Sequence, residues 1–389
     1  MRIIVFVCLL AMTGSVVVSC KKNDKTLTAT PADCVEQNSS ENGEIIEGQY
    51  IVAFQSSTTT TDAVNERSTG TLSTTVLQRN RISENALQQS FGGGPGGFVA
   101  RLSKEEVETL RTDSRIKTIE PDRIIALGAC FTVAAPTLIT WNVKQVGYGD
   151  GSGKTAWVID SGIDLDHPDL NVDATRSRSF ISKETTADDK NGHGTHVAGI
   201  IGAKNNTIGV LGIASGCNLV ALKVLGQDGK GTLSAIIQAL AYVNANGKAG
   251  DVVNMSLGED TISEILDEQV QNTAAKGIYI AIAAGNDGKP AIQFSPGRAN
   301  GSNIFTVSAV DSAGVFASFS NYGNDVVDFA APGVRILSTY MNGQYARMSG
   351  TSMAAPHVAG LLLLNGRNIK SSGTARNDPD GNADPIAHH

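Results

Sequence analysis

The 389-residue sequence lacks several features that would assign it to common functional classes. Its formal net charge is −7 and its basic residues form no cluster, so there is no sign of a nucleic-acid-binding surface. After the N-terminus no apolar run reaches the roughly 20 residues that span a bilayer, so we expect no internal membrane span. Charged residues make up 18% of the chain and apolar residues 41%, which is typical of a globular protein with a large core.

Two common motifs are also missing. No Gly-x-Gly-x-x-Gly follows a strand and opens a helix, and no His-Glu-x-x-His is present, which argues against a nucleotide cradle and a zinc protease. Residues 149–155 resemble a phosphate-binding P-loop, but Tyr148 stands where its first glycine is required. This segment also precedes a predicted strand instead of opening a helix, so we reject a nucleotide site there.

The first 19 residues predict a secretion signal. Arg2 precedes an almost unbroken apolar segment at 3–18, which ends abruptly before charged residues. The segment closes in Val-Val-Ser-Cys20, which resembles the lipobox of bacterial lipoproteins. By that resemblance Cys20 carries lipid and anchors the protein to a membrane; the alternative is an ordinary cleaved signal with a coincidental cysteine. Residues 20–44 are polar and aperiodic and predict a flexible tether.

Cysteine is scarce, with five residues in the chain. Cys8 leaves with the signal and Cys20 is assigned to lipid, so Cys34, Cys130 and Cys217 remain in an oxidising compartment. Three cysteines cannot all pair within one chain. We predict a disulfide between Cys130 and Cys217, with three free thiols as the alternative.

Residues 45–127 predict a small α+β domain. Ser103, followed three residues later by Glu106, is the signature of a capping box at the start of a helix. The element order β-α-β-β-α-β is that of a ferredoxin-like sandwich, and this segment alone shows no chemistry. The expected strand segments are 49–54, 98–102, 116–119 and 124–125.

Residues 140–365 alternate between strand and helix patterns. Such alternation predicts an α/β fold with a mostly parallel sheet covered by helices on both faces. In such sheets functional residues gather at the carboxyl ends of the strands. The expected strands are 155–159, 219–225, 252–257, 278–284 and 304–310.

Four polar residues stand at places of this kind. Ser352 opens an apolar helix, where unpaired backbone N–H groups favour negative charge. Asp160 ends a predicted strand, His193 lies between two glycines at the start of another apolar helix, and Asn286 follows a strand. Each has an ordinary alternative: a helix-capping serine, a loop carboxylate, a structural histidine and a turn residue.

Taken together, the order Asp160, His193, Asn286, Ser352 resembles that of the subtilases, the subtilisin-like serine proteases. The resemblance covers roughly residues 140–365 and implies a catalytic domain at 128–365. It implies a secreted serine endopeptidase with Ser352 as nucleophile, His193 as general base, Asp160 as the carboxylate that orients the histidine, and Asn286 as oxyanion donor.

The resemblance extends to residues 45–127, which are similar to the family's inhibitory propeptide. By this resemblance the domain assists folding, inhibits the enzyme temporarily and is removed by self-cleavage. The apolar stretch 127–135 is the natural candidate for the cleaved segment.

Substrate and calcium sites follow from the same resemblance. An extended substrate is expected to pair with two backbone segments, for each of which a plain loop is the alternative. A structural calcium ion is expected on a loop whose alternative is a plain surface loop. The substrate segments are Gly229, Lys230 and Gly231, and Ser256, Leu257 and Gly258. The calcium ligands are the side chains of Asp169 and Asn206 and the carbonyls of Lys204, Ile208 and Val210. His167, His196 and His357 are expected to be neighbours of these motifs and not members.

The C-terminus departs from the family pattern. Residues 366–389 are polar and predict a tail that covers the core poorly, or a sheet trimmed at one edge. Two rival functions are a catalytically silent scaffold used as a surface binding module, and an inhibitor acting through residues 45–127. The presence of all four catalytic positions argues against the first, and the intact domain beside the propeptide argues against the second.

Overall fold

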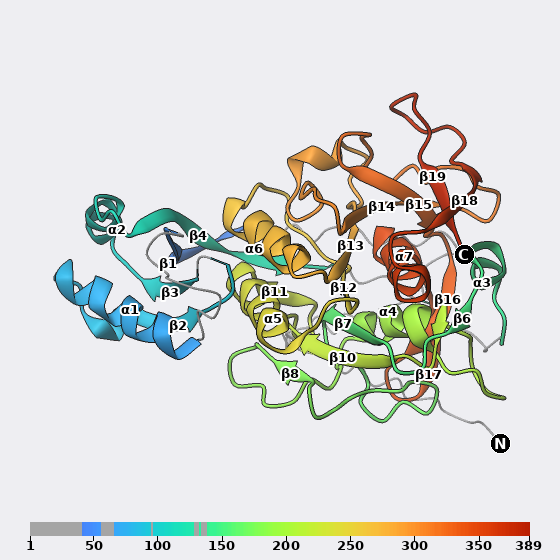
Figure 1. The fold of residues 1–389 in the computed structure, drawn as a ribbon, viewed down its shortest axis with the longest axis horizontal. Coiled ribbons are helices and arrows are strands. Elements are labelled where there is room, and N and C mark those ends of the chain that lie inside the picture. The colour runs from blue at the N-terminus through green and yellow to red at the C-terminus, as the bar shows by residue number, and fades with distance from the viewer. Residues whose placement is uncertain (1–40, 56–65, 95, 128–131, 134–137) are drawn as a thin grey trace, which may run out of the picture.

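The computed structural model describes residues 41–55, 66–94, 96–127, 132–133 and 138–389 (Figure 1). The predicted signal, most of the predicted tether, and Cys20, Cys34 and Cys130 lie outside these residues. Within them, a smaller N-terminal domain packs against a larger one. None of the helices in these ranges has the length and apolar character needed to cross a membrane.

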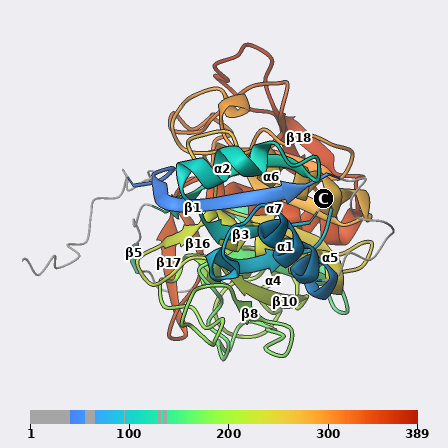
Figure 2. The ribbon, with the colours of Figure 1, turned by 90° about the vertical axis from the view of Figure 1, so that its left-hand side faces the viewer.

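The N-terminal domain is the expected β-α-β-β-α-β sandwich. Its strands pair antiparallel in the order β4-β1-β3-β2, and α1 and α2 cover the outer face of this sheet (Figure 2). The elements are β1 (Ile45–Phe54), α1 (Glu66–Arg79), β2 (Leu87–Phe91), β3 (Gly97–Arg101), α2 (Lys104–Arg111) and β4 (Ile116–Ala126), with a 3-10 turn η2 (Glu84–Ala86).

Local signals in this domain explain most of these elements. The predicted capping box is present: Ser103 Oγ accepts the Glu106 N–H at 3.2 Å, and Glu106 Oε2 accepts the Ser103 N–H at 2.8 Å. The two strand segments expected at 116–119 and 124–125 are one strand, β4, which runs through Pro121. The pairing of β1 with β4 is irregular beside Pro121, which is where a strand tolerates a residue without an N–H.

The larger domain is built on a nine-stranded sheet, and its α/β class is confirmed. All neighbouring strands are parallel except β18, which runs antiparallel to β19. In spatial order the strands are β18 (Lys370–Thr374), β19 (Pro385–His388), β15 (Val327–Pro332), β14 (Ile304–Val310), β13 (Tyr279–Ala283), β12 (Val252–Met255), β7 (Thr155–Asp160), β10 (Asn218–Lys223) and β8 (Arg178–Ser179).

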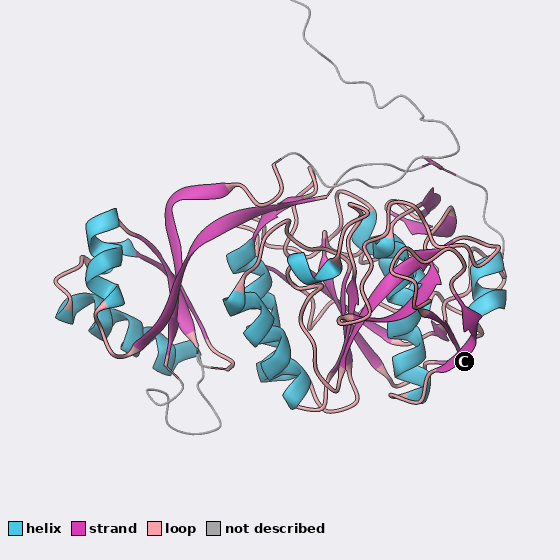
Figure 3. Ribbon diagram, turned by 90° about the horizontal axis from the view of Figure 1, so that it is seen from above, coloured by secondary structure: helices cyan, strands magenta, loops and turns pink. Residues whose placement is uncertain are grey.

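Helices lie on both faces of this sheet (Figure 3). Because strand side chains alternate, Ala156 and Val158 of β7 enter one core, whereas Trp157 and Ile159 enter the other. The first core packs against α3 (Trp141–Val146), α4 (His193–Gly202) and α7 (Thr351–Asn365). The second packs against α5 (Leu233–Asn246) and α6 (Glu264–Ala275).

Short elements complete the domain. The segment that resembled a P-loop is β6 (Gly149–Asp150) and a turn that leads into β7, in agreement with its rejection. The remaining elements are β5 (Thr132–Val133), β9 (Ala214–Ser215), β11 (Lys230–Thr232), β16 (Ile336–Tyr340), β17 (Gln344–Met348) and the 3-10 turn η3 (Ala291–Gln293).

The C-terminus corrects the prediction of a poorly covering tail. Residues 366–389 contain the hairpin β18–β19, and β19 joins the main sheet through the pair Ala330 and Ile386. Ile386 is only 6% exposed and Ala387 is fully buried. The sequence pattern missed this strand because it has just two apolar residues.

The predicted disulfide is absent. Cys217 is a free cysteine, fully buried in the core against α4, and its intended partner Cys130 lies outside the described residues. A Cβ at Gly202 of α4 would lie 2.4 Å from the Cys217 sulfur, so the thiol occupies space that the glycine provides. Burial raises the pKa of this thiol to about 12, which makes it unreactive.

Candidate active site

Asp160 and His193 meet at the carboxyl end of β7. Asp160 is the last residue of this strand, and His193 is the first residue of α4. The His193 Nδ1 lies 2.7 Å from Asp160 Oδ1, which also accepts the Ser161 N–H at 2.7 Å. Both side chains are buried, and a carboxylate at Nδ1 fixes the ring so that Nε2 can accept a proton.

Glycines allow this close approach. Gly192 has φ of 104°, a left-handed conformation, and a Cβ there would lie 2.0 Å from the ring of Tyr340. Gly194 passes the loop after β7 so closely that a Cβ would lie 2.0 Å from the Gly162 carbonyl. The two glycines that flank His193 therefore make room for Tyr340 and for the Gly162 carbonyl.

Asp189 also holds this corner, although the sequence analysis did not single it out. Its Oδ1 accepts hydrogen bonds from Ser161 Oγ and the Gly192 N–H, each at 2.9 Å. Its Oδ2 accepts the Thr195 N–H at 3.0 Å and the Thr195 hydroxyl at 2.6 Å. Asp189 thus ties the residue after Asp160 to the first turn of α4.

Lys223, at the end of β10, lies beside Asp160 in the sheet and is fully buried. Its Nζ donates to the carbonyls of Ser161 at 2.6 Å and Leu225 at 2.9 Å, and lies 3.7 Å from Glu184. No pattern in a single sequence shows that a lysine will be buried beside an aspartate. For this reason the supporting roles of Asp189 and Lys223 were not predicted.

Ser352 lies in the first turn of α7, as expected. Its Oγ donates to the Ser256 carbonyl at 3.3 Å. Pro356 has no N–H for the helical bond to the Ser352 carbonyl, and Ser256 Oγ donates to that carbonyl instead, at 2.8 Å. These bonds fasten the start of α7 to the segment that follows β12.

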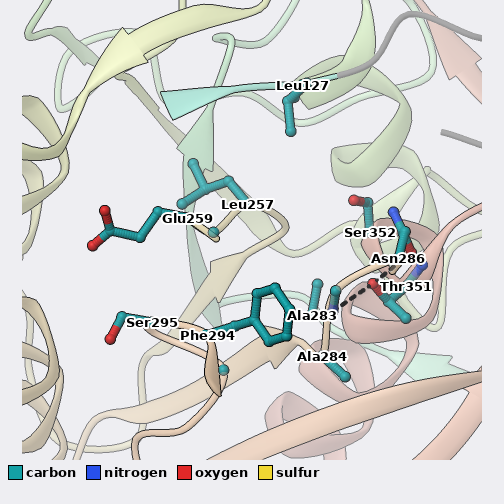
Figure 4. Close-up of a pocket in the computed structure, with 13 residues that line it drawn as sticks. Leu127, Leu257, Glu259, Ala283, Ala284, Asn286, Phe294, Ser295, Thr351 and Ser352 are labelled. Carbon is teal, nitrogen blue, oxygen red and sulfur yellow. Dashed lines mark hydrogen bonds between the residues drawn. The ribbon is translucent and has the colours of Figure 1, made fainter. Parts of the chain in front are cut away.

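Asn286 is fixed by the residue before Ser352. Its Oδ1 accepts the Thr351 N–H at 2.8 Å and the Thr351 hydroxyl at 2.9 Å. Since the oxygen is held in this way, the amide nitrogen is the end that remains for a ligand. Asn286 and Ser352 lie side by side in the wall of an apolar pocket that also includes Leu257 and Phe294 (Figure 4).

The three histidines that were expected to lie outside the catalytic motif each contact a backbone carbonyl. His196 Nε2 lies 3.0 Å from the Ile336 carbonyl, and burial lowers its pKa to about 3. His357 Nδ1 lies 2.8 Å from the Met353 carbonyl, and burial lowers its pKa to about 4. His167 Nε2 lies 3.2 Å from the Gln344 carbonyl. They support neighbouring segments, as the sequence analysis expected.

The cleft beside the pocket holds the end of the N-terminal domain. β11 pairs antiparallel with β4, Lys230 opposite Ala126 and Gly231 opposite Ile125. The Leu127 N–H continues this ladder to the Gly229 carbonyl at 3.0 Å, and Leu127 lines the pocket that contains Ser352. The chain therefore places its own strand along one of the two predicted substrate segments.

The other predicted segment, residues 256–258, makes a different contact. Asn42 stands between it and β4: its Nδ2 donates to the Gly258 carbonyl at 3.1 Å, and its Oδ1 accepts the Ala126 N–H at 2.9 Å. Asn42 is 8% exposed, so this residue of the predicted tether is packed at the interface.

Comparison with known proteins places this geometry in a family. Residues 151–373, more than half of the chain, match the model of the subtilase family. The chain belongs to the subtilase family. Residues 49–127 match the peptidase inhibitor I9 model, so the N-terminal domain is a subtilase propeptide.

Individual relatives agree with this assignment. The chain is similar to the thermostable alkaline protease of Halalkalibacterium halodurans, 40% identical over 265 residues, 68% of this chain and 71% of that protein. It is 45% identical to subtilisin BL of Lederbergia lenta over 214 residues, 55% of this chain and 76% of that protein. A solved structure, of a cold adapted subtilisin-like serine proteinase, has a TM-score of 0.56 and 33% identity, covering 65% of this chain and 98% of that one. The protein is thus a serine endopeptidase made as a zymogen.

The subtilase propeptide docks on the first turns of two helices. Asp122 accepts the Ser234 N–H at 3.0 Å and the Ser234 hydroxyl at 2.5 Å at the start of α5. Glu120 accepts the Ser263 hydroxyl at 2.7 Å and the Ile265 N–H at 3.2 Å at the start of α6. Burial raises the pKa of Glu120. The Glu-Pro-Asp segment inside β4 was the available signal, since acids seldom interrupt a buried strand without a partner.

The glycine-rich segment of the propeptide has a docking role. The Gly92 carbonyl accepts Gln269 Nε2 of α6 at 3.2 Å. A Cβ at Gly93 would lie 2.7 Å from Asn244 of α5, and one at Gly94 would lie 2.2 Å from Asn272 of α6. The segment is therefore a close contact with the catalytic domain.

The predicted calcium loop encloses Asp169. Its Oδ1 accepts Asn206 Nδ2 at 2.8 Å, and its Oδ2 accepts the Val210 N–H at 3.0 Å and lies 3.4 Å from the Tyr345 hydroxyl. Burial raises the pKa of Asp169, and the side chains that hydrogen-bond to it, Asn206 and Tyr345, are neutral. Within the described ranges no three His, Cys, Asp or Glu side chains gather around a metal position. The loop offers one carboxylate, one side-chain amide and backbone carbonyls, an oxygen-rich donor set of the type calcium takes.

Proposed function

We propose that Ser352 is the nucleophile of this endopeptidase, with His193 as general base and Asp160 as the carboxylate that orients it. The observation that carries the proposal is the 2.7 Å contact between His193 Nδ1 and Asp160 Oδ1. His193 takes the proton of the Ser352 hydroxyl during attack on the peptide carbonyl and gives it to the leaving amine. The hydroxyl now held by Ser256 turns toward the histidine when substrate arrives, because such contacts tighten in the complex.

The oxyanion is assigned to Asn286 Nδ2 and the Ser352 N–H. Support comes from Thr351, whose two hydrogen bonds hold the oxygen of Asn286 and leave its nitrogen facing the pocket. The first turn of α7 adds the positive end of the helix dipole.

Self-processing tests these roles. The parent chain is expected to lose its propeptide, with a new N-terminus inside 127–135, whereas Ser352→Ala and His193→Ala keep full length. Ser349→Ala is the matched control, because it removes a buried hydroxyl just before the same helix and is expected to process normally. Equal processing of Ser352→Ala and parent, read by intact mass and N-terminal sequencing, would reject the assignment.

Substrate is proposed to replace β4 in the cleft. Gly229, Lys230 and Gly231 pair with its backbone on one side, and Ser256, Leu257 and Gly258 lie along the other side once Asn42 has left. Pairing through backbone reads little sequence, so the enzyme accepts many extended peptides. The propeptide is then an intramolecular inhibitor that fills the same cleft.

Calcium is proposed to bind the loop around Asp169. Its ligands are the side chains of Asp169 and Asn206 and the carbonyls of Lys204, Ile208 and Val210. A bound cation neutralises the buried carboxylate and stabilises the fold without entering the reaction. EDTA is expected to lower the melting temperature of the mature enzyme, and Asp169→Asn to remove this response; an unchanged melting temperature with EDTA rejects the site.

Export and lipid anchoring through Cys20 are proposed from the sequence. The secreted character of the relatives' class favours export, and the lipobox-like segment favours a membrane anchor before maturation. Incorporation of labelled fatty acid into the chain, lost in Cys20→Ser, is the expected result. Cleavage inside 127–135 would then release the catalytic domain from its anchor.

A further inference from the structure

Glu259 is a buried carboxylate at the end of the substrate cleft, and among the described residues the cation that pairs with it belongs to the propeptide. It directly follows Gly258 and is 1% exposed. Its Oε2 accepts the Thr261 hydroxyl at 3.0 Å, and its Oε1 has no hydrogen-bond partner among the described residues. In Figure 4 its side chain lies beyond Leu257 and points away from Ser352.

The cation nearest to Glu259 belongs to the propeptide. Arg123 Nε lies 4.0 Å from Glu259 Oε2. Two acids also act on Glu259: Glu120, which belongs to the propeptide, and Asp267, which lies 3.4 Å from Arg298. When the propeptide leaves, Arg123 leaves with it, and the end of the cleft keeps an acid that has lost its cation.

Arg123 holds a defined place relative to the cleft. Ile124, Ile125 and Ala126 pair with β11, so Arg123 is the residue immediately before the paired segment. Side chains alternate along an extended strand, which puts Arg123 on the same face as Ile125 and Leu127. A peptide that replaces β4 in the same register therefore brings its own residue to Glu259, four positions before the one at the place of Leu127.

We propose that Glu259 selects a basic side chain, arginine or lysine, at this substrate position. The inference rests on the proposed function, because it requires substrate to lie in the cleft as β4 does. The ligand is a positively charged side chain of the peptide. Glu259 recognises it through a charge-assisted contact to its carboxylate, in a site that is partly shielded from water. The propeptide then inhibits partly by offering the side chain that a good substrate offers.

Peptide cleavage tests this selection. The probe is an internally quenched peptide of residues 122–132 with Cys130→Ser, made with Arg123, with Arg123→Gln and with Arg123→Glu. The mature parent enzyme is assayed at pH 9, because burial raises the pKa of Glu259 to about 8 when β4 fills the cleft, and the carboxylate has to stay ionised beneath a bound peptide. We expect kcat/KM to be about tenfold higher for the arginine peptide than for the glutamine peptide, the size of one charge-assisted contact.

Enzyme variants assign the effect to Glu259. Glu259→Gln is expected to treat the arginine and glutamine peptides alike, and Glu259→Lys to prefer the glutamate peptide. Glu268→Gln is the matched control: this acid also contacts the propeptide, through Lys117 at 2.7 Å, but lies on α6 outside the cleft. It is expected to keep the parent's preference.

Each outcome decides the inference. A parent that cleaves all three peptides equally overturns the selection and leaves the proposed catalytic function standing, with no variant needed. A preference that persists in Glu259→Gln overturns the assignment to this residue. A parent that cleaves none of the peptides overturns both the selection and the proposed cleft.

Discussion

The contact between Asp122 and the first turn of α5 makes a quantitative prediction about zymogen latency. Asp122 belongs to the propeptide and is fully buried. It accepts two hydrogen bonds from Ser234 and one from Gln49 Nε2 at 2.7 Å, so its charge is held by donors from both domains. We consider Asp122→Asn, which removes the charge, and Asp122→Ala, which removes every acceptor.

The magnitude follows from these bonds. Asp122→Asn keeps the shape of the side chain but removes its negative charge. The hydrogen bonds to Ser234 then lose their charge assistance and the favourable interaction with the α5 dipole is lost, which costs about 1 to 3 kcal/mol of binding free energy. Asp122→Ala leaves the Ser234 N–H and Gln49 without their acceptor in a buried place, at a cost of about 3 to 5 kcal/mol. Since a factor of ten corresponds to about 1.4 kcal/mol, propeptide binding should weaken roughly five- to 150-fold in Asp122→Asn and roughly 150- to several-thousandfold in Asp122→Ala.

The assay is the delay between self-processing and activity. After cleavage the propeptide remains bound, and activity appears as it dissociates, so weaker binding shortens the delay because most affinity changes lie in the dissociation rate. Glu108→Gln is the matched control, because this exposed acid of α2 pairs with Arg111 of the same helix. A delay in Asp122→Ala that equals the delay in Glu108→Gln refutes the reasoning.

Three further predictions follow from the structure. Asn286→Ala is expected to lower kcat roughly a hundredfold or more with little change in KM, measured on a peptide substrate, and a normal kcat contradicts its role. Burial raises the pKa of Glu259 to about 8 in the zymogen, so docking of the propeptide favours the protonated acid; propeptide binding should therefore weaken as pH rises through about 8, and Glu259→Gln should flatten this dependence in a release assay. Deleting residues 366–389 removes β19 and the buried Ile386, which should lower the melting temperature or solubility of Ser352→Ala; an unchanged melting temperature would mean that the hairpin is dispensable.

Much of the fold was accessible from the sequence because its signals are local and redundant. The capping box at Ser103, the buried strand that ends at Asp160 and the apolar helix that starts beside Ser352 each combine periodicity with a boundary residue. The family resemblance then supplied what local patterns lack, namely which distant residues meet. The contact of Asp160 with His193 joins positions 33 residues apart, and no spacing rule in a single sequence predicts it.

The predictions that failed concern residues whose structure is set by remote contacts and not by local signals. The strand at Ile386 carries two apolar residues and exists because the edge of β15 receives it. Asn42 sits in a polar segment without periodicity, yet it is buried because Gly258 and Ala126 offer it a carbonyl and an N–H. Cys217 was paired on the grounds of compartment and count, but its sulfur is committed to packing against Gly202. In each case the residue that fixes the local structure is remote in the sequence, so composition and local pattern do not predict the contact.

Helix N-termini link the catalytic and inhibitory parts of the zymogen. The first turn of α7 offers N–H groups to the anion that forms at Ser352 during reaction, while the first turns of α5 and α6 offer theirs to Asp122 and Glu120. The first anion is transient and the other two belong to the propeptide. Removing the propeptide therefore returns two helix ends to water at the moment the cleft opens, and the mature domain loses the carboxylates that capped them. We expect the propeptide to matter most while α5 and α6 are being positioned, because Asp122 and Glu120 then add to the helices' own N-caps, Thr232 and Ser263.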